Sequence, residues 1–105
     1  MANQYTPDQW IVVELTQGDT TVRKVLAGWW GGYLNGDSWR LSSGITDIEI
    51  DGDYYKIHNE SGSVYTGHKN NYGVTGLSGG VLANWQEQAR GREDVTITVI
   101  DQDKL

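Results

Sequence analysis

Aromatic rings, glycines and one arginine gather in a single stretch, Gly28 to Arg40. The residues there that could contact a ligand are Trp29, Trp30, Tyr33, Asp37, Trp39 and Arg40. Indole and phenol rings offer flat faces, a guanidinium offers a forked cation, and glycine lets a ligand approach the backbone closely. The stretch therefore predicts either a clamp for a small, planar, nucleotide-like anion or an energetic hot spot for a protein partner.

The same rings also fit a structural role. Trp29 or Trp30, together with Trp39, could close the open end of a small barrel. The chain has five Trp and six Tyr but no Phe, so every large ring carries a polar group suited to a half-buried position. We expect one or two rings of the cluster to remain exposed.

Two histidines, His58 and His68, are the residues whose unperturbed side chains titrate near neutral pH. A metal site needs a third ligand, and a catalytic base needs a nucleophile or an activated water nearby. No residue at a fixed spacing supplies either requirement. We therefore expect no catalytic residue, no metal and no cofactor, and a small enzyme working through His58 or His68 is the alternative.

Two short motifs resemble ligand-binding loops without completing them. The acidic residues from Asp47 to Asp53 look like the start of a calcium loop, but its twelfth position is His58 instead of an acidic ligand. The glycine-rich run Gly76–Gly80 could present backbone N–H groups to an anion, yet it lacks the lysine of a P-loop. A hairpin and a helix start explain these residues better.

Composition limits the classes of partner. The chain has 105 residues, a common size for one domain, and we expect a single domain over residues 1–105. The net charge of -6 disfavours nucleic acids and anionic membranes, because Lys and Arg supply most of the affinity for phosphate. No run of residues is apolar for as long as a membrane-spanning helix requires.

Two features of the chain favour a reducing compartment. Cysteine is absent, whereas small secreted domains are often held together by disulfides. The polar start, Met1 to Pro7, has neither the basic nor the apolar region of a secretory signal. We expect the protein in the cytoplasm.

The hydrophobic pattern predicts short strands joined by turns. Expected strands cover residues 10–15, 20–27, 38–42, 45–50, 53–58, the segment that follows Gly62, and 94–101. The stretch Gly28–Gly36 is expected to be a loop or a bulged connection, with a turn at Asn35–Asp37. One helix is expected from an N-cap at Ser78 to a stop at Gly91, with an apolar stripe that includes Leu82 and Trp85.

The central three strands form the best-specified part. A two-residue Asp51–Gly52 loop would pair Ile50 with Asp53, and a three-residue loop ending at Gly62 would pair Ile57 with Tyr65. The residues expected on the core face are Ile48, Ile50, Tyr55, Ile57 and Tyr65. The fold class is mainly β: a small antiparallel SH3-like barrel or roll of about six or seven short strands with one short C-terminal helix. A bent sheet, with edges protected by homo-oligomerisation, is the alternative.

One stretch of the sequence resembles a known group of viral proteins. The run KVLAGWWGGYLNGDSWRLSSGI, followed by DGDYY and SGSVYTGHKNNYG, is similar to small uncharacterised proteins of large tailed phages that infect marine cyanobacteria. The resemblance covers about Lys24 to Gly73 and implies a viral protein made in the host cytoplasm. We expect a non-enzymatic accessory protein that binds a host protein or sequesters a small ligand. A minor virion or assembly component is the alternative.

Overall fold

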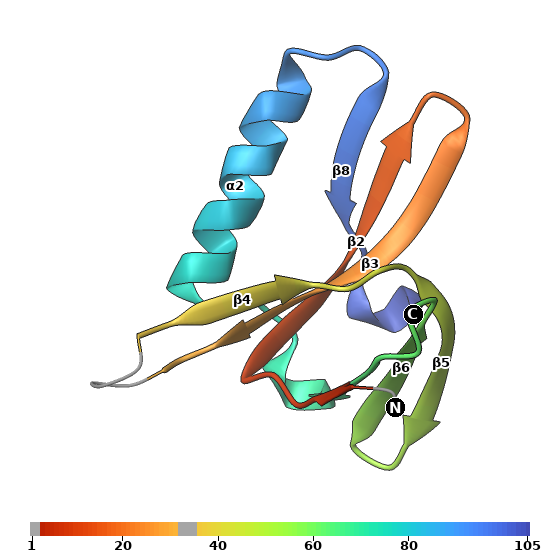
Figure 1. The fold of residues 1–105 in the computed structure, drawn as a ribbon, viewed down its shortest axis with the longest axis vertical. Helices are drawn as coiled ribbons and strands as arrows, with labels where there is room; N and C mark the ends of the chain where they lie inside the picture. Colours follow the sequence, from red (N-terminus) through yellow and green to blue (C-terminus); the bar gives the residue numbers. More distant parts are fainter. Residues whose placement is uncertain (1–2, 32–35) are drawn as a thin grey trace.

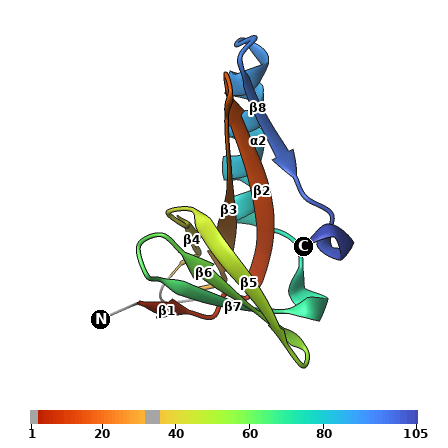
Figure 2. The same ribbon diagram turned by 90° about the vertical axis from the view of Figure 1, so that its right-hand side faces the viewer.

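Two sheets and a long helix are stacked in three layers (Figures 1 and 2). The computed structural model describes residues 3–31 and 36–105, which contain eight strands, one α-helix and two short 3-10 helices. The strands are β1 (Gln4–Tyr5), β2 (Gln9–Gln17), β3 (Thr20–Trp29), β4 (Ser38–Leu41), β5 (Ile45–Asp51), β6 (Tyr54–Asn59), β7 (Val64–His68) and β8 (Val95–Val99); the helices are Lys69–Asn71, α2 (Gly76–Arg90) and Gln102–Lys104.

The strands of the described residues form two separate four-stranded sheets. The first sheet has the order β1-β7-β6-β5, and the second has the order β4-β3-β2-β8. All neighbouring pairs are antiparallel except β1 and β7, which are parallel. The mainly β class and the C-terminal helix are therefore confirmed. Closure into an SH3-like barrel is not confirmed, because the two sheets are not joined into one closed sheet.

The second sheet is covered on both faces where β2 begins and β3 ends. Trp10 and Val12 lie in the core cluster between the two sheets, whereas Ile11 and Val13 belong to the cluster beneath α2. Four consecutive apolar residues are what a strand covered on both faces requires. Farther along, β2 and β3 extend beyond the first sheet (Figure 2), and the half-buried Glu14 there pairs with Arg23 of β3 at 3.0 Å.

The Trp10 indole is the largest buried side chain and lies at the junction of the layers. Its ring packs against Tyr55 and edge-on against Tyr72, and its Nε1–H donates to the His68 carbonyl at 2.9 Å. Gly67 of β7 makes room for it, because a Cβ at that position would lie 2.4 Å from the indole Cε2 atom. The indole therefore requires glycine at this point of β7.

The Tyr72 hydroxyl joins β2 to the chain beyond β8. It accepts a hydrogen bond from the Val12 N–H at 2.9 Å and donates one to the Ile100 carbonyl. Burial raises the pKa of the Tyr72 phenol, so the proton that this second bond needs is retained.

The predicted meander of β5, β6 and β7 is confirmed, and one of its two registers is corrected. Ile57 pairs with Tyr65, as predicted. In the β5–β6 hairpin, however, Asp51 pairs with Tyr54, so the two-residue loop is Gly52–Asp53. Gly52 has a φ of 61°, and a loop that begins with glycine needs a positive φ at that first position alone.

The corrected register preserves the predicted faces of β5 and β6. The pairing differs from the predicted one by two residues, an even number, so Ile48 pairs directly with Ile57 and both still point to one side. Ile57 is buried in the core, whereas Ile50 is 66% exposed near the end of β5. Among the five residues expected on the core face, the prediction was therefore wrong for Ile50 alone. Ile50 lies on the predicted face, but a side chain on that face is buried only where another layer covers it.

The helix begins earlier than predicted. Its N-cap is Thr75, whose hydroxyl accepts from the Ser78 N–H at 3.1 Å, and the Ser78 hydroxyl accepts from the Thr75 N–H at 2.9 Å. This reciprocal pair starts the helix despite its glycines. The C-terminal stop at Gly91 is confirmed, and Leu82 and Trp85 face the second sheet as expected.

We predict that Gly67→Ala lowers the free energy of unfolding by about 1–3 kcal/mol or more, since the new methyl group overlaps the Trp10 ring. The control Gly80→Ala has open space around its Cβ in α2 and should raise stability by about 1 kcal/mol. Urea unfolding followed by tryptophan fluorescence measures both. Equal effects of the two substitutions would contradict the Trp10–Gly67 contact.

Candidate functional site

The structure divides the predicted aromatic cluster between the two faces of the second sheet. In the β3–β4 pair, Gly28 lies opposite Trp39 and Ala27 lies opposite Arg40. Paired residues share a face, and neighbours along a strand alternate. Ala27 belongs to the core between the sheets, so Arg40 lies on that side and Trp39 lies on the side of α2. Tyr33, the remaining ring of the prediction, lies outside the described residues.

Trp29 has a structural position. It is half-buried at the end of β3, where its ring meets the edge of Tyr5 at 6.2 Å and its Nε1–H donates to the Thr6 carbonyl at 3.0 Å. The predicted loop was therefore placed too early, because β3 continues through Gly28 and Trp29. This arrangement agrees with the alternative in which one ring of the cluster fills the core.

Gly28 lets the start of α2 come against β3. A Cβ on Gly28 would lie 2.9 Å from two side-chain atoms of Thr75 and 3.0 Å from the Ser78 hydroxyl. The glycine that looked like a loop signal in the sequence is thus a contact point between the sheet and the helix.

Among the described rings of the cluster, Trp30 and Trp39 are the exposed ones. Trp39 packs edge-to-face on Trp85 of α2 at 5.4 Å and remains 40% exposed. Trp30 is 55% exposed, and its backbone N–H donates to the Asp8 carboxylate at 2.9 Å. Asp37 accepts a bond from the next N–H, that of Gly31, at 3.3 Å. Two carboxylates therefore hold the backbone that presents Trp30.

Arg40 lies at a polar pocket of about 320 Å³ on the other face. Its guanidinium carbon is 4.6 Å from the centre of the Tyr5 ring, and Tyr5 stacks on Tyr65 at 4.9 Å. Burial raises the pKa of the Tyr65 phenol, and the positive charge of Arg40 opposes that rise. The chain beyond β4 and the β6–β7 turn complete the pocket with serines 42, 43, 61 and 63.

Sequence reasoning missed Tyr5 and these serines. Tyr5 belongs to a two-residue strand that pairs in parallel with β7, and such a short strand leaves no periodic pattern. Ser42 was predicted to end a strand, and the other serines lie in or directly after predicted turns; only the folded sheets bring these segments together.

Both histidines make structural contacts. His58 Nε2 lies 3.1 Å from a Glu49 carboxylate oxygen across the β5–β6 pair. His68 Nδ1 accepts from the Asn70 N–H at 3.0 Å, and its ring meets Tyr54 edge-on. In the part of the chain that the structure describes, no three His, Cys, Asp or Glu residues are grouped so that they could hold a metal ion.

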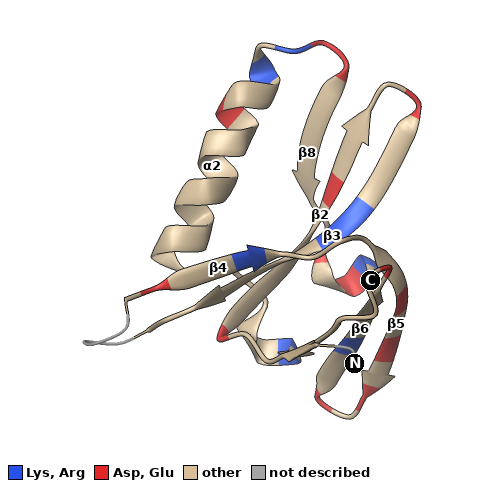
Figure 3. Cartoon of the chain, in the orientation of Figure 1, with Lys and Arg blue, Asp and Glu red and all other residues tan. Residues whose placement is uncertain are grey.

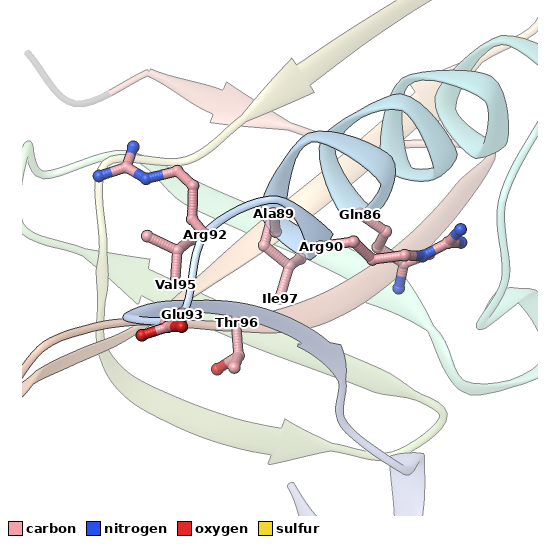
Figure 4. Close-up of a pocket in the computed structure, with 8 residues that line it drawn as sticks. All are labelled: Gln86, Ala89, Arg90, Arg92, Glu93, Val95, Thr96 and Ile97. Carbon is pink, nitrogen blue, oxygen red and sulfur yellow. The ribbon is translucent and has the colours of Figure 1, made fainter.

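A more open pocket of about 520 Å³ lies between the end of α2 and β8 (Figure 4). Its two arginines do not converge. The Arg90 and Arg92 side chains point away from each other in Figure 4, and each has a carboxylate partner, Glu87 at 2.6 Å and Asp94 at 3.9 Å. The pocket therefore offers no shared charge for a ligand.

Lys and Arg occupy scattered positions on the described strands, helix and turns, and Asp and Glu lie among them (Figure 3). The helices in residues 3–31 and 36–105 are all too short or too polar to cross a membrane. Comparison of the chain with protein-family models, curated proteins and solved structures found no match in any of the three. The resemblance to phage proteins remains a prediction.

We predict that substitutions of the two neighbouring tryptophans affect stability to very different extents. Trp29→Ala should lower the free energy of unfolding by about 2 kcal/mol or more, because packing and the bond to Thr6 are lost. Trp30→Ala should change it by less than about 0.5 kcal/mol, because the side chain is mostly exposed. Thermal and urea unfolding test this difference. A large loss with Trp30→Ala would show that this ring has a structural role.

Proposed function

We propose that this protein is a non-enzymatic phage accessory protein that binds a host protein through the exposed rings of Trp30 and Trp39. The observation that carries the proposal is the exposure of Trp30 on a fixed backbone. Tryptophan is the residue type most enriched among binding hot spots, and a mostly exposed indole adds little to the stability of its own domain.

The backbone bonds favour a role in recognition. Asp8 and Asp37 hold the N–H groups of residues 30 and 31, so binding does not have to order this segment first. Trp39 is supported from behind by Trp85. A partner therefore meets a supported Trp39 ring and a Trp30 side chain on a backbone that hydrogen bonds hold.

The charges around Trp30 indicate the chemistry of the partner. The carboxylates of Asp8 and Asp37 accept from the backbone N–H groups of Trp30 and Gly31, and the whole chain has a net charge of -6. A complementary surface has an apolar recess for the indole and a basic rim. We expect a host cytoplasmic protein with such a recess.

The histidine contacts support a binding role over an enzymatic one. His58 faces Glu49, and His68 caps the short helix that follows β7. In the described residues, neither ring nitrogen makes a hydrogen bond to a serine, threonine or lysine side chain that could serve as a nucleophile. A histidine that acts as a catalytic base needs such a neighbour.

We predict that Trp30→Ala abolishes capture of the partner while the domain stays folded. Wild type, Trp30→Ala and the control Ile50→Ala are each immobilised and exposed to lysate of the host bacterium. Ile50 is a matched control because it is a large apolar side chain, 66% exposed, on β5 of the other sheet. Mass spectrometry should identify a protein that wild type and Ile50→Ala retain and Trp30→Ala loses.

Binding of that purified partner then supplies the quantitative test. Trp30→Ala should weaken Kd by about thirtyfold, which corresponds to the roughly 2 kcal/mol of a hot-spot residue. Ile50→Ala should leave Kd unchanged. If all three proteins retain the same set of host proteins, the surface at Trp30 is not the binding site and the proposal fails.

A further inference from the structure

The pocket at Arg40 has the features of a separate ligand site. It lies between β1, the residues that follow β4 and the turn between β6 and β7, on the face of the second sheet opposite Trp39. Its volume of about 320 Å³ is near the lower end of the range for small-molecule sites. Stacked rings of Tyr5 and Tyr65 form one wall, and serine hydroxyls form another.

Arg40 brings a positive charge that the protein leaves without an ion-pair partner. Within residues 3–31 and 36–105, Arg40 and Lys24 are the two Lys or Arg residues with no carboxylate oxygen within 4.0 Å. Lys24 pairs with Val13, which places it on the opposite face of the sheet. In a chain with fourteen acidic residues, an arginine at a pocket without a carboxylate is available to an external anion.

Three serine hydroxyls at the pocket accept hydrogen bonds from the protein. Ser42 Oγ accepts from the Val25 N–H at 2.8 Å, and Ser43 Oγ accepts from the Ser61 N–H at 3.0 Å. Ser63 Oγ accepts from the Ser61 hydroxyl at 3.0 Å. Because the protein uses these three oxygens as acceptors, each hydroxyl proton remains to be donated. A ligand that only accepts hydrogen bonds matches this set.

We infer that the Arg40 pocket binds the phosphate group of a small phosphorylated molecule. The donors come from three segments: Arg40 on β4, Ser42 and Ser43 after it, and Ser63 in the β6–β7 turn. A phosphate presents oxygens in several directions to such donors, whereas a carboxylate presents two oxygens that one guanidinium can satisfy alone. The pocket volume of about 320 Å³ leaves room for a small organic group attached to the phosphate.

This ligand site is independent of the proposed protein contact. Arg40 and Trp39 lie on opposite faces of β4, so substitutions can remove one function and leave the other. Loss of phosphate binding with intact partner capture, or the reverse, separates the failure of either proposal from the failure of the other.

The test is an NMR titration of the isotope-labelled protein with four probes: inorganic phosphate, O-phosphoserine, serine and acetate. We expect phosphate and O-phosphoserine to shift the backbone amide signals of residues 40–43 and 61–63 saturably. Serine and acetate should not do so. No saturable shift with phosphate or O-phosphoserine, or equal shifts with acetate, would overturn the inference.

Two matched variants test whether the positive charge that binds the phosphate is that of Arg40. Arg40→Met should weaken the affinity for O-phosphoserine by about tenfold or more, as expected for the loss of a charge-assisted hydrogen bond. Lys24→Met removes the other unpaired cation and should change the affinity by less than about twofold, because long-range attraction is screened. Equal losses in the two variants would mean that net charge alone attracts the anion, and the site would be rejected.

A third variant covers the case in which Arg40→Met disturbs the contact with Tyr5 and unfolds the domain. Arg40→Lys keeps the charge but loses the fork that can bond two oxygens together. We expect its spectrum to remain folded and its affinity to fall below that of wild type. Wild-type affinity in folded Arg40→Lys would contradict recognition by the guanidinium.

Discussion

Burial of the Trp10 indole between the two sheets is the constraint on which the rest of the structure depends. The ring occupies space that β7 leaves free only because residue 67 is glycine. That contact fixes where β7 lies on β2, and it places Tyr65, two residues earlier on the same face, inside the core. Tyr5 then stacks on Tyr65, and Arg40 lies over Tyr5. The position of the pocket residues therefore depends on the packing of Trp10.

Local patterns in the sequence predict most of the elements, because each strand carries its own alternation. They do not decide between Asp51–Gly52 and Gly52–Asp53 as the hairpin loop, since both keep the same faces inward. The early start of α2 depends on a Thr75–Ser78 pair that lacks the glutamate of the usual capping box. Strand β1 has two residues, and its parallel pairing with β7 leaves no local signal.

The candidate site was harder to predict than the fold because neighbours in a sequence are not neighbours on a surface. Trp39 and Arg40 were combined into one cluster, although the strand predicted for residues 38–42 already places consecutive side chains on opposite faces. Tyr5 and Ser63 could not be added to Arg40 from the sequence, because packing of one sheet on the other brings them together.

Strand β4 is short, lies at the edge of its sheet and is paired through β3 alone. It nevertheless contributes Trp39 to one face and Arg40 to the other. The same four residues therefore support both surfaces, and the position of β4 on β3 sets where each of the two side chains lies. An edge strand thus links two surfaces that share no side chain.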